Sequence, residues 1–88
     1  MTTASFQQIV QTIPTQPGIY KYYNEGHELL YVGKAKNLKK RISSYFNKNL
    51  SSYKTHELVQ RIHLIEFTIV DSEQAAIFFD NSLIKQFC

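Results

Sequence analysis

Apolar side chains at the start of the chain recur at helical spacing. Four positions follow the i, i+3, i+4, i+7 rule: Phe6, Ile9, Val10 and Ile13. Ser5 and Gln8 have the spacing of a capping box, which favours a helix that begins near Ser5. Pro14 and Pro17 follow, and proline does not continue a helix because it lacks the backbone N–H. The pattern predicts a short amphipathic helix that ends before Pro14.

Two segments downstream are rich in aromatic and β-branched residues, which is typical of strands. They are residues 18–23 and 29–32, and the polar segment 24–27 between them contains Gly26. We therefore expect a β-hairpin. Gly33 is predicted to break the second strand, because a glycine in a strand interior has no side chain to pack.

A helix with one apolar and one basic face is predicted after the hairpin. Asn37 is a suitable N-cap for this helix. Its apolar positions are Leu38, Ile42, Tyr45 and Phe46. The small polar residues from 47 to 52 indicate a loop, and a second helix is expected from about residue 53 to residue 63. The inward positions of this second helix are Leu58, Val59 and Ile62.

The last part of the chain predicts one more strand and one more helix. The strand covers residues 65–70, and Asp71 or Ser72 can cap the helix that follows. The stripe expected to pack on the sheet is Ala76, Phe79, Leu83 and Phe87. The element order is then αββααβα. This order favours an α+β fold with a small three-stranded antiparallel sheet flanked by helices.

Length and composition restrict the class of protein. With 88 residues, of which 43% are hydrophobic, the chain is expected to form a single packed domain over residues 1–88. The one cysteine, Cys88, excludes an internal disulfide and a cysteine-based zinc site. No apolar run approaches the roughly 18 residues of a membrane span, and the polar start does not resemble a signal peptide. We expect a cytoplasmic protein with no membrane partner.

Basic residues gather in one part of the chain. The formal net charge is +3, and no acidic residue lies between Glu28 and Glu57. The basic residues in this window are Lys34, Lys36, Lys39, Lys40, Arg41, Lys48 and Lys54. Such a window can be an ordinary solvated surface, but its uninterrupted sign favours a partner that carries phosphates.

Asp80 occupies an apolar part of the last predicted helix. Its neighbours at helical spacing are Ala76, Leu83, Ile84 and Phe87. An ionised carboxylate on an apolar face costs several kcal/mol unless it is paired or bound to a metal. Asp80 can therefore be a boundary residue, form a salt bridge to Arg41 or Lys85, or act as an oxygen ligand for Mg²⁺ or Mn²⁺.

Two tyrosines fall on the two strands of the predicted hairpin, each near a glycine. They occur in the segments Gly18-Ile-Tyr20 and Tyr31-Val-Gly33. Sequence statistics alone make them cross-strand aromatics. Residues 33–36 lead directly into the basic helix, so ammonium and guanidinium groups are expected near the phenols, and nearby cations lower the pKa of a phenol.

Taken together, these segments resemble the GIY-YIG nuclease domain, and within it the UvrC branch. The matching segments are Gly18-Ile-Tyr20, residues 31–41, Ser44-Tyr-Phe46, and residues 72–85 from Ser-Glu to Leu-Ile-Lys. The resemblance covers about residues 13–87, and the two tyrosine motifs in this order make it specific. It implies a metal-dependent DNA endonuclease that makes one incision, on the 3′ side of a lesion, in nucleotide excision repair.

The resemblance also implies roles for individual residues. Tyr31 acts as general base on the attacking water, and Tyr20 orients that water or the scissile phosphate. Tyr45 lies near the phosphate, and Lys34 helps to hold the tyrosine in its active protonation state. Arg41 binds the phosphate, for which its planar fork is suited because it gives two parallel hydrogen bonds to phosphate oxygens.

Asp80 takes the position of the family's metal-binding glutamate, so the resemblance implies one bound Mg²⁺ or Mn²⁺ ion. Aspartate is one methylene shorter than glutamate, which requires the metal to move or to bind through water. The alternative is a catalytically weak or silent DNA-binding module of the same fold. The lysines expected to contact DNA are Lys36, Lys39, Lys40, Lys48 and Lys54.

The implied partners are damaged duplex DNA and a UvrB-type repair subunit. That subunit would be bound through the rest of a longer chain, from which this domain is excised, and the isolated domain is expected to be a monomer. A nuclease nicks DNA when metal is added, whereas a silent module binds DNA in a salt-dependent way without nicking. If the tyrosines are only core and the lysines only solvated surface, the protein has no DNA affinity at moderate salt.

Overall fold

The computed structural model describes residues 1–47 and 52–70. In chain order the elements are α1 (Thr3–Ile9), the 3₁₀ turn η1 (Val10–Thr12), β1 (Gly18–Tyr23), β2 (Leu29–Ala35), α2 (Leu38–Tyr45), α3 (Tyr53–Arg61) and β3 (Leu64–Ile69). Over these residues the predicted element order and the α+β class are confirmed. The last predicted helix, which contains Asp80, lies outside the described residues, and so does Lys48.

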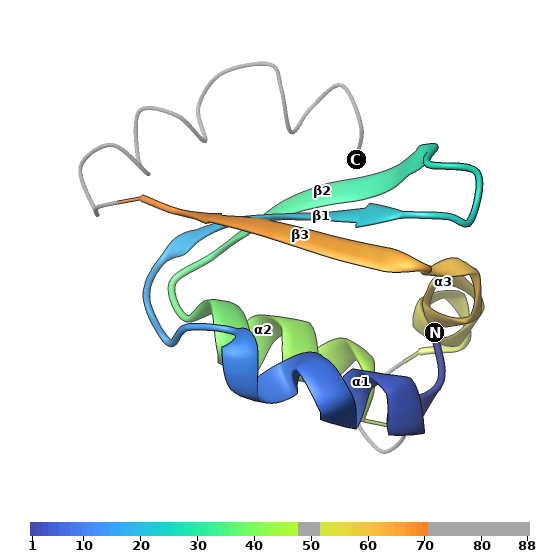
Figure 1. Ribbon diagram of the computed structural model, residues 1–88, viewed down its shortest axis with the longest axis horizontal. Coiled ribbons are helices and arrows are strands. Elements are labelled where there is room, and N and C mark those ends of the chain that lie inside the picture. Colours follow the sequence, from blue (N-terminus) through green and yellow to red (C-terminus); the bar gives the residue numbers. More distant parts are fainter. Residues whose placement is uncertain (48–51, 71–88) are drawn as a thin grey trace.

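The strands form one antiparallel sheet in the order β2-β1-β3, so β1 is central (Figure 1). The predicted hairpin is β1 and β2. Tyr20 of β1 is paired with Gly33 of β2 and with Phe67 of β3. Directly paired residues point to the same face of a sheet. The register therefore decides which side chains meet on each face.

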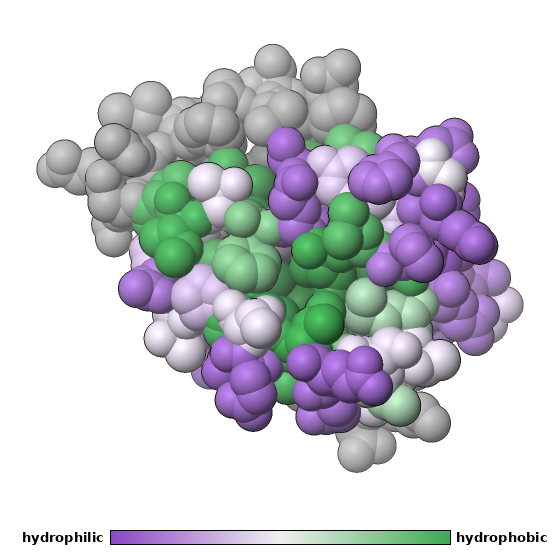
Figure 2. Space-filling view, in the orientation of Figure 1, coloured by the Kyte–Doolittle hydropathy of each residue, from purple (hydrophilic) through white to green (hydrophobic). Residues whose placement is uncertain are grey.

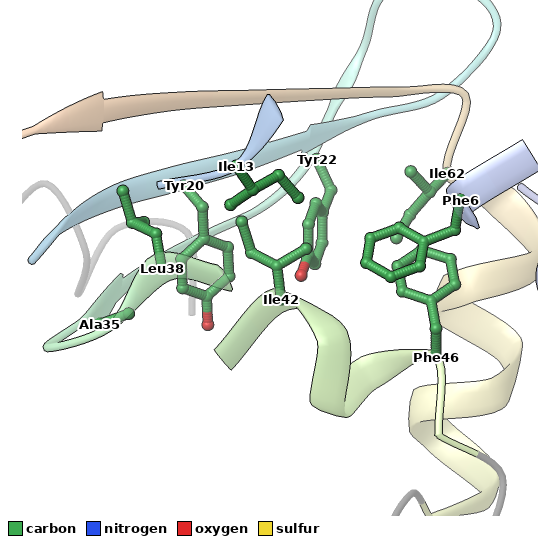
Figure 3. Close-up of a cluster of buried hydrophobic side chains, with 9 residues drawn as sticks. All are labelled: Phe6, Ile13, Tyr20, Tyr22, Ala35, Leu38, Ile42, Phe46 and Ile62. Carbon is green, nitrogen blue, oxygen red and sulfur yellow. The ribbon is translucent and has the colours of Figure 1, made fainter. Parts of the chain in front are cut away.

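In the described part of the chain, α1, α2 and α3 lie on one side of the sheet (Figure 1). The buried even-numbered residues Tyr20 and Tyr22 of β1 pack in the same cluster as Leu38 and Ile42 of α2. The buried cluster between helices and sheet consists of Phe6, Ile13, Tyr20, Tyr22, Ala35, Leu38, Ile42, Phe46 and Ile62 (Figure 3). Burying a large apolar side chain stabilises a fold by about 1.5–3 kcal/mol. This cluster is therefore the main source of stability among the described residues.

The first helix begins earlier than its sequence pattern predicts. Thr2, not Ser5, is the N-cap, because its side-chain oxygen accepts a hydrogen bond from the Ser5 backbone N–H at 3.0 Å. The α-helix ends at Ile9, and η1 carries the chain to Ile13 just before Pro14. The capping-box interpretation of Ser5 was wrong because Thr2 supplies an equivalent oxygen three residues earlier.

The second strand does not break at Gly33. β2 continues to Ala35, and Gly33 is paired with Tyr20 inside the ladder. The prediction treated this glycine as a strand breaker, but its missing side chain leaves room for a tyrosine ring. The strand thus runs past Gly33 and ends two residues before Asn37, the N-cap of α2.

The turn of the hairpin takes its unusual backbone conformation at a histidine rather than at the glycine. His27 has a φ of 64°, whereas no glycine among the described residues has a positive φ. Asn24 holds the turn, because its side-chain oxygen accepts from the Glu28 backbone N–H at 2.9 Å. The positive φ of this turn therefore lies at His27, next to Gly26.

Two further caps fix the remaining helices. Asn37 accepts a hydrogen bond from the Lys40 backbone N–H at 3.0 Å, which confirms the predicted N-cap of α2. Ser52 caps α3 in the same way at 3.3 Å. The α2 backbone is also bound to the linker before β1, because the Leu38 N–H donates to the Gln16 carbonyl at 3.0 Å. These contacts hold α2 against the sheet.

The face seen in Figure 2 is apolar across its centre and towards its upper left, and hydrophilic at its right and along its lower edge. Where α1 and η1 face β3, apolar side chains line a hollow of about 210 Å³, among them Ile9, Ile13, Leu64, Ile65 and Phe67 (Figure 2). Among the described strands β3 lies at an edge of the sheet, and Ile69 at its end is 51% exposed. Within the described ranges, no helix has the length and apolar character needed to cross a membrane.

Candidate active site

Two hydroxyl groups meet at the centre of the candidate site. The Tyr20 and Tyr45 hydroxyls are hydrogen-bonded at 2.8 Å, although 25 positions separate them in the chain. Tyr20 projects from the central strand and is 1% exposed, while Tyr45 is half-buried at the end of α2. The packing of α2 on the sheet therefore brings together two of the tyrosines named from sequence.

Tyr31 and a fourth tyrosine complete the group. We name Tyr20, Tyr22, Tyr31 and Tyr45 the tyrosine cluster, since the ring centroids of every pair lie 5.1–6.3 Å apart. Tyr22 is absent from the sequence-based site residues. A signal was present, however, because residues i and i+2 of a strand share a face and Tyr22 follows Tyr20 at that spacing.

Gly33 makes room for the cluster. A Cβ atom placed on Gly33 would lie 2.5 Å from both Cζ and the hydroxyl oxygen of Tyr20, and 2.8 Å from Cε2 of Tyr31. Real side chains do not approach so closely, so any larger residue would displace one or both rings. The glycine of the second motif is therefore required for the position of the phenols in both motifs.

Burial raises the pKa of Tyr20 well above its ordinary value, and the hydrogen bond to Tyr45 acts in the same direction. The positive charge of Arg41 lowers this pKa, but it has the smaller effect. The predicted lowering of a phenol pKa by a nearby cation is thus present at Tyr20, but burial outweighs it. Because Tyr20 is almost fully buried, loss of solvation of its phenolate outweighs the attraction of an exposed guanidinium. Tyr20 therefore keeps its proton at neutral pH.

Arg41 lies on α2, one turn before Tyr45, and residues i and i+4 share a helix face. Its positive charge lowers the pKa of both Tyr20 and Tyr22, which agrees with its position one turn before Tyr45. Arg41 is exposed to solvent. A phosphate could thus reach the guanidinium from outside while it remains close to the phenols.

The predicted lysines are distributed over several surfaces. Lys36 and Lys40 are exposed and Lys39 is half-buried, all at or near the start of α2, and Lys54 is exposed on α3. Lys34 is also exposed, but it is paired with Ile19 and thus lies on the sheet face opposite the tyrosine cluster. The structure brings Arg41 to the cluster and does not bring Lys34 into it.

Potential metal ligands are not clustered in the described part of the chain. No group of three or more His, Cys, Asp or Glu side chains occurs within residues 1–47 and 52–70. Mg²⁺ prefers carboxylate oxygens together with water and substrate phosphates. The phenol oxygens of the tyrosine cluster do not replace a carboxylate, and the predicted ligand Asp80 lies outside the described residues.

Comparison with known proteins decides the family. The model of the UvrC-like GIY-YIG domain matches residues 16–88, which include the whole tyrosine cluster and α2. The chain belongs to this family. UvrABC system protein C of Flavobacterium psychrophilum is 48% identical over 85 residues, or 97% of this chain, and its Methanococcus maripaludis counterpart is 50% identical over 78 residues, or 89%. This UvrC-like domain spans only 14% and 15% of the length of these two relatives.

Solved structures confirm the fold. The GIY-YIG N-terminal endonuclease domain of UvrC from Thermotoga maritima, bound to its catalytic divalent cation magnesium, matches with a TM-score of 0.76 and 29% identity. The match covers 99% of this chain and 93% of that one. A variant of the same domain with one tyrosine replaced by phenylalanine, also bound to its catalytic divalent cation, matches with a TM-score of 0.76 and 28% identity, over 99% of this chain and 92% of that chain. The UvrC-like GIY-YIG domain described here therefore has the three-stranded α+β architecture of a cation-binding endonuclease domain.

Proposed function

We propose that this domain is a metal-dependent DNA endonuclease that hydrolyses one phosphodiester bond on the 3′ side of a lesion in nucleotide excision repair. The observation that carries this proposal is the tyrosine cluster with Arg41 beside it. It combines buried hydroxyl groups, an accessible guanidinium and the fold of a domain that binds a catalytic divalent cation. Such a combination is suited to binding and activating a phosphodiester.

The structure supports Tyr31, rather than Tyr20, as the general base. A base must first lose its own proton, and burial opposes this at Tyr20, which is 1% exposed. Tyr31 is half-buried and lies closer to solvent. In the proposed step the Tyr31 phenolate takes a proton from water. The water oxygen forms a bond to phosphorus as the bond to the leaving oxygen breaks, and solvent protonates that oxygen.

The hydroxyl pair of Tyr20 and Tyr45 acts as a hydrogen-bond donor. Only one of the two hydroxyl protons is used in the bond between them, so the other proton is available for a phosphate oxygen or the attacking water. The high pKa of Tyr20 suits this role, because a phenol that keeps its proton continues to donate. We assign both residues to orienting the substrate rather than to proton removal.

Arg41 is proposed to hold the scissile phosphate. Its guanidinium is exposed, and two parallel N–H···O bonds to phosphate oxygens would fix the phosphate next to the phenols. Lys36, Lys39 and Lys40, with Lys48 and Lys54, are proposed to contact the DNA backbone. Because Lys34 lies on the opposite face of the sheet, it is proposed to support the protonation state of the site through its charge and not by contact. Binding should then weaken as salt rises, because each neutralised phosphate releases counterions.

The proposed cofactor is one Mg²⁺ or Mn²⁺ ion with Asp80 as its carboxylate ligand, and it would stabilise the negative charge that develops on the phosphate oxygens. The proposed partners are damaged duplex DNA and a UvrB-type subunit that contacts the rest of a longer chain, with this domain itself a monomer. Because the domain spans only 14% of a matching relative, other parts of the protein are expected to supply most of the affinity for the lesion.

The test is a nicking assay on a lesion-containing duplex, with the full-length protein and its repair subunits in Mg²⁺ or Mn²⁺. Tyr31→Phe, Arg41→Ala and Asp80→Ala are each expected to abolish nicking without preventing assembly on DNA. Tyr53→Phe is the matched control, because Tyr53 is 77% exposed on α3 and lies outside the tyrosine cluster.

Different outcomes separate the two candidate functions. If wild type binds DNA but never nicks it, and Asp80→Glu restores nicking, the domain is a silent binding module whose shorter carboxylate fails to hold the metal. If wild type nicks DNA and Tyr31→Phe is as active as Tyr53→Phe, the site assignment is wrong.

A further inference from the structure

Tyr22 is the most deeply buried member of the tyrosine cluster. It is 0% exposed and is paired with Tyr31 across the β1–β2 ladder. Its ring centroid lies 5.1 Å from that of Tyr45, 5.3 Å from Tyr20 and 6.3 Å from Tyr31. One ring therefore contacts every other phenol of the proposed active site.

The geometry of these contacts is favourable for the rings involved. Tyr45 meets Tyr22 edge-on at 85°, an arrangement that aromatic quadrupoles prefer. The Tyr31 ring is stacked beside Tyr22 with an interplanar angle of 30°. The fully buried Tyr22 ring thus packs against both the Tyr31 ring and the Tyr45 ring.

The hydroxyl of Tyr22, unlike its ring, makes no favourable contact in the described part of the structure. In the described part of the structure it is buried without a hydrogen-bond partner, whereas the Tyr20 hydroxyl is bonded to Tyr45. Figure 3 shows Tyr22 pointing from β1 towards α2, among the buried apolar side chains. A buried hydroxyl without a partner is destabilising relative to an apolar group of the same shape.

We propose that Tyr22 is a positioning residue of the nuclease site, which acts through its ring and not through its hydroxyl. The ring holds Tyr31 and Tyr45 in the orientations that the reaction needs. This inference rests on the proposed function, because those two phenols are its proposed reacting and orienting groups. A displacement of reacting groups by about 1 Å can lower a rate about a hundredfold. Removal of the Tyr22 ring should therefore lower the rate constant of nicking more than it lowers DNA affinity.

The experiment compares three variants of the full-length protein in the nicking assay. Tyr22→Leu removes the ring, Tyr22→Phe removes only the hydroxyl, and Phe6→Leu removes an equally buried ring elsewhere in the core. Phe6 is 2% exposed, and among the described residues its aromatic contact is a stack on Phe46 at 4.1 Å. It is therefore a matched control for core damage that leaves the tyrosine cluster in place.

We expect Tyr22→Leu to lower kcat roughly ten- to a hundredfold with little change in KM, and Tyr22→Phe to restore kcat. Phe6→Leu should change kcat much less, at a temperature where all variants are folded. Equal losses in Tyr22→Leu and Phe6→Leu would reduce Tyr22 to an ordinary core residue. A Tyr22→Phe variant as slow as Tyr22→Leu would show that the hydroxyl acts, and would overturn the proposal.

A second measurement decides the matter even if the wild-type protein does not nick DNA, in which case the proposed function fails separately. NMR spectra with labelled tyrosine rings would report the surroundings of Tyr20, Tyr31 and Tyr45 directly. Tyr22→Leu should shift all three ring resonances, whereas Phe6→Leu should leave them nearly unchanged. Unshifted Tyr31 and Tyr45 rings in Tyr22→Leu would refute the positioning role.

Discussion

Gly33→Ala gives the most direct test of how the sheet positions the phenols. The added Cβ would stand 2.5 Å from Cζ and the hydroxyl oxygen of Tyr20, so the ring must move or the strands must separate. Overpacking of this kind costs about 1–3 kcal/mol. Displacing Tyr20 also breaks its hydrogen bond to Tyr45, which is worth about 1 kcal/mol.

One effect acts in the opposite direction. Alanine loses less backbone entropy than glycine on folding, which offsets about 0.5–1 kcal/mol. The net destabilisation expected for Gly33→Ala is therefore about 1–3 kcal/mol. For a domain of this size each kcal/mol lowers Tm by about 4–8 °C. Thermal unfolding followed by circular dichroism, combined with urea unfolding, would measure the change.

Gly26→Ala is the matched control. Its Cβ would lie 3.5 Å from Oδ1 of Asn24 and 3.7 Å from Oε1 of Glu28, which are ordinary van der Waals contacts. We expect Gly26→Ala to change the free energy of unfolding by less than about 0.5 kcal/mol and to leave nicking intact. If Gly33→Ala proves as mild as Gly26→Ala in both stability and nicking, the argument that Gly33 makes room for Tyr20 is refuted.

Three further predictions follow from single contacts. His27→Gly should stabilise the protein by about 0.5–1 kcal/mol, because a φ of 64° is strained for a side chain other than glycine, and a Tm no higher than that of His27→Ala would contradict this. Asn37→Ala should lower the free energy of unfolding by about 1 kcal/mol, because the Lys40 N–H loses its cap. Urea unfolding measures the change, with Gln7→Ala, at an exposed position of α1, as control. The free energy of unfolding should fall as pH rises above about 10. Burial raises the pKa of Tyr20 and Tyr22 above the ordinary 10.0, so these two phenols stay protonated in the folded protein while they ionise in the unfolded chain. Tyr20→Phe should flatten this alkaline slope by up to about 1.4 kcal/mol per pH unit, and an unchanged slope would argue against its burial.

Local pattern was sufficient for most of the elements. Asn37 as a helix cap, the helical spacing of Phe6 and the apolar face of α2 were all correct, because capping and amphipathic periodicity depend on near neighbours in sequence. The wrong predictions arose where a short sequence pattern is compatible with two local structures. Thr2 and Ser5 can both cap a helix, and Gly33 can either end a strand or admit a ring.

The candidate site divides in the same way. The resemblance to the GIY-YIG family singled out Tyr20, Tyr31, Tyr45 and Arg41. The structure brings the three phenols together, and the charge of Arg41 acts on Tyr20. Lys34 directly follows the Tyr31-Val-Gly33 motif, but its side chain lies on the sheet face opposite the tyrosine cluster, because successive side chains of a strand point to opposite faces. The metal role of Asp80 stays a prediction, since that residue lies outside the described residues.

The sequence by itself determined the succession of helices and strands up to residue 70, the basic window and the family motifs, since each is encoded in spacing along the chain. Only the tertiary structure decided that the Tyr20 and Tyr45 hydroxyls meet, that Tyr22 joins them, and that burial rather than Arg41 sets the pKa of Tyr20. The physical reason is that these properties depend on which sheet face α2 covers. That choice is made by the packing of the whole core, which places residues 25 positions apart in contact.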